Sequence, residues 1–137
     1  KRFKAYSAGS HPTGYIHPET LHIVNAIAYP TASLRSKSWD EFASPTAPHM
    51  DFIFTVCDEA ADLTCPIWPG HPISAHWRFE DPTAHDESPE QLHQHFLRVF
   101  HQIRHHVQLF DALPFATLDH MTLKQEVRNI ARVVELA

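Results

Sequence analysis

The chain has 137 residues, of which 43% are hydrophobic, and a net charge of −5 at pH 7. This length is enough to bury one core and too short for two ordinary domains, so we expect a single domain over residues 1–137. A chain with this negative net charge is not expected to have the positively charged surface that binds a nucleic-acid backbone, which argues against nucleic-acid binding. Because we find neither a membrane-length apolar run nor a signal peptide, we expect a cytoplasmic protein without a membrane partner.

The N-terminal third of the chain predicts a strand followed by a helix. Residues 3–8 alternate aromatic and small side chains and lead to Gly9, which is typical of a short strand entering a loop. Pro18 suits the first turn of a helix, and apolar residues recur at helical spacing from Leu21 until Pro30 ends the pattern.

The middle of the chain predicts a capped turn and two strands. Ser38 and Glu41 have the form of a capping box, in which the serine hydroxyl accepts from the Glu41 amide and the glutamate reaches back. Residues 51–56 form an apolar and β-branched run of the kind that is buried on both faces of a parallel sheet. Residues 73–77 predict another short strand, which a polar loop at 80–83 follows.

The C-terminal part predicts two amphipathic helices. Ser88 and Gln91 supply a capping box for a long helix that extends to about Phe110. A last helix is expected from its cap at Asp119 to about Val134. Strands that alternate with helices predict an α/β fold with a parallel sheet, whose chemistry is expected at the carboxyl ends of the strands.

Two cysteines are the first candidates for chemistry. Cys57 ends the strongest predicted strand, and Cys65 follows after seven intervening residues, a spacing that leaves a disulfide geometrically open. Two inert thiols, one of them buried at the strand end, are an equally good reading of the residues alone. The negative charges of Asp58, Glu59 and Asp62 raise the pKa of a nearby thiol, so these cysteines fit relays better than first nucleophiles.

A metal site is a weaker alternative for the same region. Cys57, Cys65, His71 and His76 form a two-cysteine, two-histidine set within twenty residues, but zinc ligands usually come in pairs with two to four intervening residues. The 13 histidines of the chain are scattered, which fits solvated faces better than one site. We therefore expect no bound metal.

One acidic residue is a candidate proton donor. Asp81 precedes Pro82 in the loop after the predicted strand at 73–77, and a simple Asp-Pro turn is the more ordinary reading of this pair. The sixth positions after the two cysteines are Leu63 and His71, so neither cysteine begins a Cys-x5-Arg loop that holds an oxyanion.

An ordered series of motifs resembles a known family over essentially the whole chain. The motifs are SAGSHP at 7–12, LRSKSWDEF at 34–42, VCD at 56–58, CPIWPG at 65–70, AHW at 75–77, DP at 81–82 and LP at 113–114. They are similar to the bacterial thioredoxin-coupled arsenate reductases, which are built on the low-molecular-weight protein tyrosine phosphatase fold.

The resemblance implies a four-stranded parallel sheet flanked by helices and a relay of three cysteines. In the family a first cysteine, in an N-terminal phosphate-binding loop, attacks arsenate. The second matches Cys57, attacks the resulting adduct and releases arsenite; the third matches Cys65 and presents the disulfide to thioredoxin. Asp81 matches the general acid. Thioredoxin is then the reductant, arsenate or a phosphate-like oxyanion is the substrate, and no cofactor is bound.

The chain departs from the family pattern in one major respect. The family's first strand, Cys-x5-Arg loop and first helix do not occur in these residues. We therefore expect these residues alone to be inactive, either as a piece of a longer enzyme or as a homologue that lost its active loop. If the chain truly starts at Lys1, a second copy or a strand-swapped assembly is expected to fill the place of the first strand. A low-molecular-weight phosphatase and an inactive binding or metal-binding module are the alternative functions. A smaller departure is Tyr29-Pro30, where a glycine-bearing helix end is expected.

Overall fold

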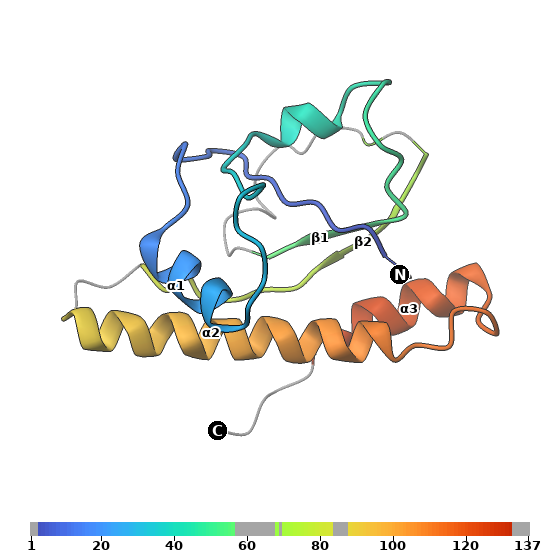
Figure 1. Ribbon diagram of the computed structural model, residues 1–137. Coiled ribbons are helices and arrows are strands. Elements are labelled where there is room, and N and C mark those ends of the chain that lie inside the picture. The colour runs from blue at the N-terminus through green and yellow to red at the C-terminus, as the bar shows by residue number, and fades with distance from the viewer. Residues whose placement is uncertain (1–2, 57–67, 69, 84–87, 133–137) are drawn as a thin grey trace. The chain divides into compact units, whose positions relative to one another are not determined.

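The computed structural model describes residues 3–56, 68, 70–83 and 88–132 (Figure 1). Its elements in chain order are α1 (Pro18–Ala26), the 3-10 turn η1 (Trp39–Phe42), β1 (Phe52–Thr55), β2 (Ile73–His76), α2 (Pro89–Asp111) and α3 (His120–Ile130). The chain divides into two compact units, Lys1–His49 with Cys65–Gly70 and Met50–Thr64 with His71–Ala137. The expectation of one domain stays a prediction.

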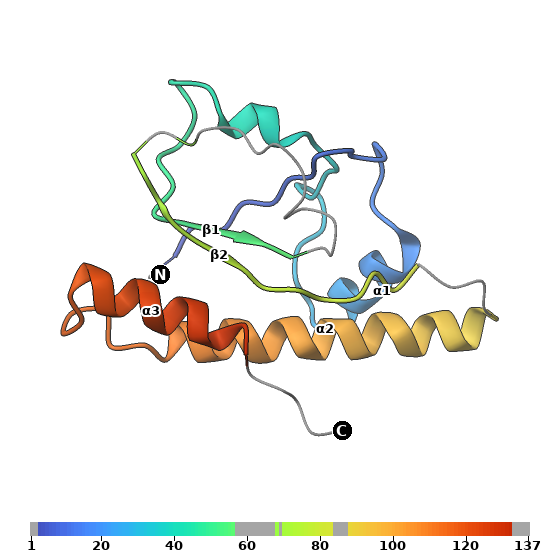
Figure 2. The same ribbon diagram turned by 180° about the vertical axis from the view of Figure 1, so that it is seen from behind.

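The second unit contains a parallel pair of strands, which confirms the α/β class. β1 and β2 pair in parallel, in a register that sets Phe52 opposite Ile73 and Thr55 opposite His76. Both strands lie within the predicted segments 51–56 and 73–77. α2 and α3 lie on the same side of this pair, as two opposite views show (Figures 1 and 2). The described residues contain two of the four strands that the resemblance implies.

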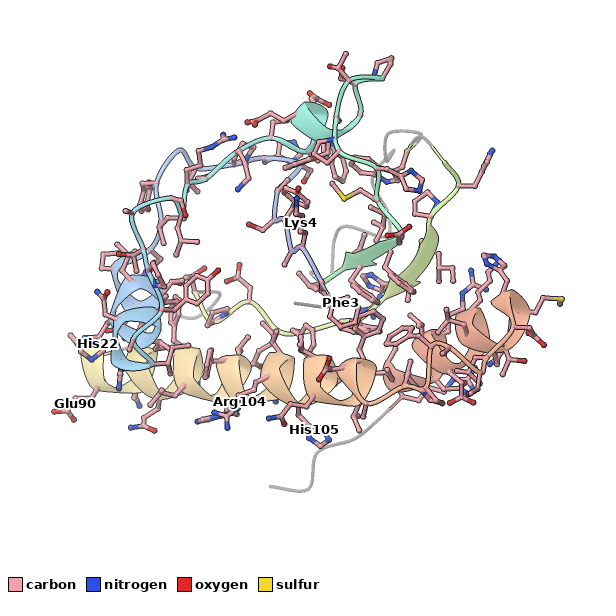
Figure 3. All side chains as sticks on the ribbon, turned by 45° about the vertical axis from the view of Figure 1, so that its right-hand side comes forward. Phe3, Lys4, His22, Glu90, Arg104 and His105 are labelled. Carbon is pink, nitrogen blue, oxygen red and sulfur yellow. The ribbon has the colours of Figure 1, made fainter. Side chains whose placement is uncertain are left out.

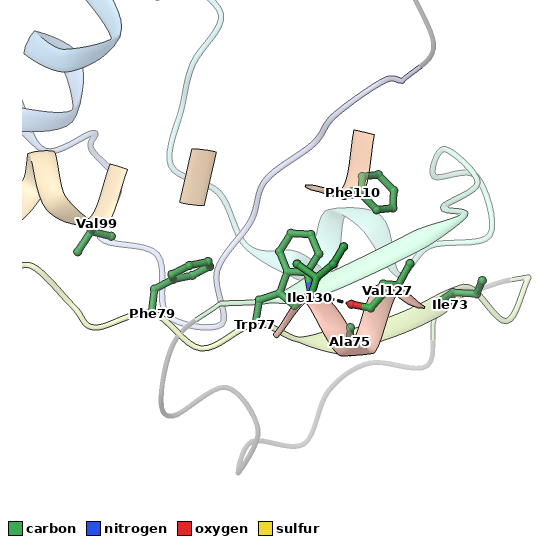
Figure 4. Close-up of a cluster of buried hydrophobic side chains, with 8 residues drawn as sticks. All are labelled: Ile73, Ala75, Trp77, Phe79, Val99, Phe110, Val127 and Ile130. Atoms are coloured by element: carbon green, nitrogen blue, oxygen red, sulfur yellow. Dashed lines mark hydrogen bonds between the residues drawn. The ribbon is translucent and has the colours of Figure 1, made fainter. Parts of the chain in front are cut away.

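Aromatic side chains form the centre of the core in this unit. Phe54 of β1 stacks on Trp77 with ring centroids 3.9 Å apart, and Phe110 of α2 packs edge-on against both rings. Val127 of α3 is fully buried. Figure 4 shows the buried cluster, whose members are Ile73, Ala75, Trp77, Phe79, Val99, Phe110, Val127 and Ile130. The strands are thus held to both helices by one apolar cluster.

β1 is less buried than its sequence predicts. All four of its side chains are half-buried, whereas residues 51–56 read as a strand covered on both faces. Phe52 and Phe54 lie on the same face of the strand, because alternate residues share a face, and both contact Phe110 of α2. Within the part of its unit that the structure describes, β1 is paired along one edge only, with β2.

The caps of α2 and α3 follow the prediction. The Ser88 hydroxyl accepts from the Gln91 amide at 3.3 Å, and the Gln91 side chain accepts from the Ser88 amide at 3.2 Å. Asp119 caps α3 by accepting from the Thr122 amide at 2.7 Å. The expected continuation of this helix to Val134 lies outside the described residues.

The outer face of α2 is polar. Figure 3 shows Glu90, Arg104 and His105 pointing away from the strands. His106 lies on the inner side instead, where it is 6% exposed and packs against Phe79, with ring centroids 4.8 Å apart. The prediction that the histidines as a group belong to solvated faces is therefore wrong for His106. Among the described residues, no helix is both long and apolar enough to cross a membrane.

In the first unit, α1 ends earlier than Pro30. Tyr29 donates its amide to the Val24 carbonyl at 3.2 Å, and Ala28 donates to Asn25 at 3.0 Å. This pair of bonds is a Schellman motif, whose left-handed position usually belongs to glycine. Ala28 occupies that position with φ 59°. The departure at Tyr29-Pro30 is therefore a glycine-type helix end formed around an alanine.

Ser38 caps the 3-10 turn η1, but not by the predicted capping box. Its hydroxyl accepts from the Asp40 amide at 3.1 Å rather than from Glu41. The Glu41 carboxylate accepts instead from the two terminal nitrogens of Arg35, at 2.8 and 2.5 Å. The prediction is wrong in this detail because a charged partner outcompetes a backbone amide for the glutamate.

The strand predicted at residues 3–8 does not form. The nearest sheet-like pairing is one parallel bridge between Gly9 and Ser38, in which Gly9 donates to Lys37 and Trp39 donates to Gly9, both at 3.0 Å. A segment becomes a strand only when a neighbour supplies a continuous ladder of hydrogen bonds, and no described residue does so for 3–8.

Candidate active site

The strongest candidate site is the edge of the sheet where both strands end. Trp77 donates its amide to the Thr55 carbonyl at 2.8 Å, and Phe79 donates to the Val56 carbonyl at 2.9 Å. The pairing therefore continues past His76 and holds the segment after β2 beside the end of β1. Parallel α/β sheets place their ligands at this carboxyl edge.

Three side chains form a hydrogen-bonded line at this edge. Thr55 Oγ1 and His76 Nδ1 lie 2.6 Å apart, and Arg78 Nε lies 3.5 Å from His76 Nε2. A guanidinium can only donate, so His76 Nε2 accepts and its Nδ1 carries the ring proton. In this tautomer the His76 ring donates through Nδ1 to the Thr55 hydroxyl oxygen.

Two buried rings anchor the segment that leads to Asp81. Trp77 is 3% exposed, and its indole nitrogen donates to the Val127 carbonyl at 3.2 Å (Figure 4). Phe79 is 7% exposed and packs against His106. Asp81 follows Phe79 by two residues, so the buried Phe79 ring fixes the backbone close to the candidate acid.

Asp81 itself lies exposed in a local turn. Its Oδ1 accepts from the Thr83 amide at 2.8 Å and from the Thr83 hydroxyl at 2.6 Å. Glu80 is tied to Arg98 of α2 through a 2.6 Å ion pair. These contacts are those of an ordinary Asp-Pro turn, and they hold one carboxylate oxygen of Asp81 while the other has no partner among the described residues.

The two candidate cysteines lie outside the described residues. Cys57 comes directly after Val56, the last described residue of that segment, and Cys65 falls within the same gap. Their pairing stays a prediction. Among the described side chains no group of three or more histidine, cysteine, aspartate or glutamate residues lies close enough to hold a metal.

A surface cavity of about 250 Å³ lies within the first unit. Its lining residues are Ser7, Ala8, Gly9, Pro12, Tyr15, Ile16, His17, Thr20, Arg35, Ser36 and Lys37. The hydrogen bond to Arg35 lowers the pKa of Glu41 below its usual value, and the bond to Glu41 raises that of Arg35. The Arg35 guanidinium is thus already hydrogen-bonded to Glu41 through both of its terminal nitrogens.

Thr55 and Arg78 are site residues that motif reading missed. Neither residue is part of a recognisable catalytic motif, and threonine in a strand or arginine in a loop is too common to indicate a site. The strand register would have found Thr55, because pairing residues 52–55 with 73–76 sets it opposite His76.

Comparison with known proteins identifies the family of this chain. The low molecular weight phosphotyrosine protein phosphatase family matches residues 1–127. An arsenate reductase from Shouchella clausii (strain KSM-K16) is 29% identical over 108 residues, which are 79% of this chain and 74% of that protein. An arsenate reductase from Bacillus subtilis (strain 168) has the same identity and coverage, and one from Oceanobacillus iheyensis is 26% identical over 110 residues, 80% of this chain and 76% of that protein. With its parallel strands, helices on one side and a polar carboxyl edge, the chain belongs to the low molecular weight phosphotyrosine protein phosphatase family.

Proposed function

We propose that the complete protein reduces arsenate to arsenite through a cysteine relay that thioredoxin regenerates, and so serves arsenic detoxification. The observation that carries this proposal is that relatives bearing the name arsenate reductase match about four fifths of the chain. The presence of both Cys57 and Cys65 supports it, because a phosphatase of this family type needs neither for phosphoryl transfer.

The relay transfers two electrons from thiols to arsenic. A first cysteine, held in an oxyanion loop that residues 1–137 do not contain, forms a bond from sulfur to arsenic and releases water. The Cys57 thiolate then attacks that sulfur, which forms a disulfide and releases arsenite with arsenic reduced. Cys65 attacks Cys57, frees the first cysteine, and leaves a Cys57–Cys65 disulfide that a thioredoxin dithiol reduces.

Asp81 is the proposed general acid. Protonation of the departing oxygen by a carboxyl group makes water rather than hydroxide the leaving group. The two hydrogen bonds from Thr83 hold Oδ1 of Asp81 and support this role by fixing the direction of the carboxyl group.

Phosphatase activity is the second candidate, and the description of the matched family favours it. The first cysteine and the acid suffice for a phosphatase, whereas arsenate reduction also needs the two later thiols. The dependence on Cys57 therefore separates the two functions.

The decisive experiment measures arsenite formed from arsenate by the complete protein with thioredoxin, thioredoxin reductase and NADPH. We expect Cys57→Ser and Cys65→Ser to abolish turnover and Asp81→Asn to slow it strongly, while Asp40→Asn, the same change on an exposed turn, leaves it intact. Hydrolysis of p-nitrophenyl phosphate is measured in parallel. Phosphate hydrolysis that Cys57→Ser does not affect, without any arsenite formation, would establish the phosphatase instead.

A second experiment tests the relay on residues 1–137 alone. Mild oxidation followed by peptide mapping is expected to find a Cys57–Cys65 disulfide that thioredoxin reduces. If the cysteines instead cross-link only between molecules, the relay assignment is wrong.

A further inference from the structure

Two histidines one helical turn apart lie on the polar outer face of α2. His101 is exposed and His105 is half-buried, and both belong to the middle of a helix of 23 residues. Figure 3 shows His105 pointing away from the strands. Residues four positions apart in a helix are neighbours on its surface, with Cβ atoms about 5–6 Å apart. Two imidazoles with this spacing can reach the same ion beside the helix.

The core face of α2 fixes the orientation of this pair. Phe110 belongs to the buried apolar cluster, and His106 is 6% exposed. Successive helical residues are about 100° apart around the axis, so His106 faces the core although it directly follows His105. The same arithmetic sets His101 and His105 only about 40° apart, on the side opposite the core. The helix therefore presents both rings to the same side without any rearrangement of the backbone.

The ring nitrogens of both histidines are available for coordination. The His101 ring packs edge-on against the Phe100 ring, with centroids 5.5 Å apart. This contact engages no nitrogen, and no described residue forms a hydrogen bond or an ion pair with His101 or His105. An imidazole nitrogen with its lone pair is the commonest protein ligand for transition-metal ions.

The charges near the pair determine which property of an ion the site can select. Arg98, one turn before His101, is held by Glu80 at 2.6 Å. Arg104 is the nearest other cation along the helix, and it points outward as well (Figure 3). Its repulsion of a metal ion is weakened by water and salt at this exposed surface. Selection therefore depends on the nitrogen ligands, which favour Zn²⁺, Ni²⁺ and Cu²⁺ over the oxygen-preferring Mg²⁺ and Ca²⁺.

We propose that His101 and His105 form a two-ligand surface site for a divalent transition-metal ion such as Zn²⁺. Catalytic and structural zinc sites have three or four protein ligands, so here water completes the coordination and the ion exchanges with solution. A two-ligand site agrees with the finding that no larger ligand group occurs among the described side chains. The site is independent of arsenate reduction, and a bound ion would tie together one turn of α2.

The first test locates the bound ion. The complete protein, with its thiols alkylated so that they do not compete, is titrated with Zn²⁺ and followed by calorimetry and by NMR of the histidine rings. We expect the resonances of His101 and His105 to shift together, and Mg²⁺ to shift neither. His101→Ala or His105→Ala should weaken binding at this site at least tenfold, because the second ligand no longer acts within the same molecule.

The second test changes the spacing and keeps the composition. Gln108 is exposed and lies three positions after His105. The double variant His101→Ala with Gln108→His retains two imidazoles three positions apart, which are still neighbours on the helix, and should bind Zn²⁺ about as tightly as the parent. The double variant His105→Ala with Gln108→His leaves them seven positions and about 10 Å apart, and should bind at least tenfold more weakly.

A control and two contrary results complete the design. His120→Ala removes a single exposed histidine at the start of α3 and should leave this binding unchanged. Circular dichroism during thermal unfolding confirms that each variant is folded. If Zn²⁺ does not shift the His101 and His105 resonances of the folded protein, or if the two double variants bind it equally well, the proposal is overturned.

Discussion

Glu41 holds Arg35 through two parallel hydrogen bonds, from the two terminal nitrogens of the guanidinium to the two carboxylate oxygens, at 2.8 and 2.5 Å. This bond lowers the pKa of the Glu41 carboxyl below its usual value of 4.5. Because this pKa is lowered in the folded protein, the ion pair contributes fully to stability when the pH is above the usual pKa of glutamate. The contribution is lost as the pH falls through the lowered pKa.

A pH titration tests this pair. Carboxyl carbon chemical shifts followed by NMR should give Glu41 a midpoint below the usual glutamate value, and Arg35→Gln should move this midpoint upward, because the hydrogen-bonded cation is gone. An unchanged Glu41 midpoint in Arg35→Gln would contradict the ion pair.

The end of α1 predicts a stabilising substitution. Ala28 has a left-handed backbone, which costs an L-residue with a Cβ about 1 kcal/mol relative to glycine. We expect Ala28→Gly to raise the free energy of unfolding by about that amount in urea titrations. Ala26→Gly, at the last residue of α1, should instead lower it by about 0.5 kcal/mol. A destabilised Ala28→Gly would show that the left-handed turn does not form.

The core predicts a contrast between two valines. Val127 is fully buried between α3 and the strands, whereas Val107 is 49% exposed on α2. We expect Val127→Ala to lower the free energy of unfolding by about 2 kcal/mol, because buried methyl groups and their contacts are lost. Val107→Ala should change it by less than about 0.5 kcal/mol. Equal effects in thermal or urea unfolding would contradict the placement of α3.

The turn at Asp81 predicts a graded loss of activity. Asp81→Asn removes the proposed acid and is expected to reduce kcat of arsenate reduction by a factor on the order of 100 or more. Thr83→Val removes one of the two bonds to Oδ1 and keeps the backbone one, so a loss of only a few-fold is expected. A Thr83→Val loss as large as that of Asp81→Asn would mean that the turn, rather than the acid, is what activity requires.

Elements with strong local signals could be predicted from the sequence. The capping box at Ser88, the cap at Asp119 and the strand at 51–56 each depend on neighbouring residues or on one apolar run, and the structure has all three in place. Features that depend on distant partners could not be predicted. The Ser38 capping box failed because Glu41 prefers Arg35, and residues 3–8 form no strand because pairing is a property of two segments.

The candidate site shows the same division. Asp81 could be singled out from its place after a predicted strand, and the structure puts it in a hydrogen-bonded turn. Thr55 and the core position of His106 carry no local signal, because each is defined by residues about twenty or more positions away. The relay assignments of Cys57 and Cys65 stay predictions.

The ladder beyond β2 also determines where the chain tolerates a change in length. Trp77 and Phe79 are both buried because they alternate with exposed Arg78 on a segment that is still paired to residues 55 and 56. One inserted residue before Trp77 would turn both rings outward and Arg78 inward, since successive side chains of an extended chain face opposite sides. Insertions that arise in natural relatives are therefore expected away from this segment, for example near Ser44, and a designed graft or tag in this protein belongs there too.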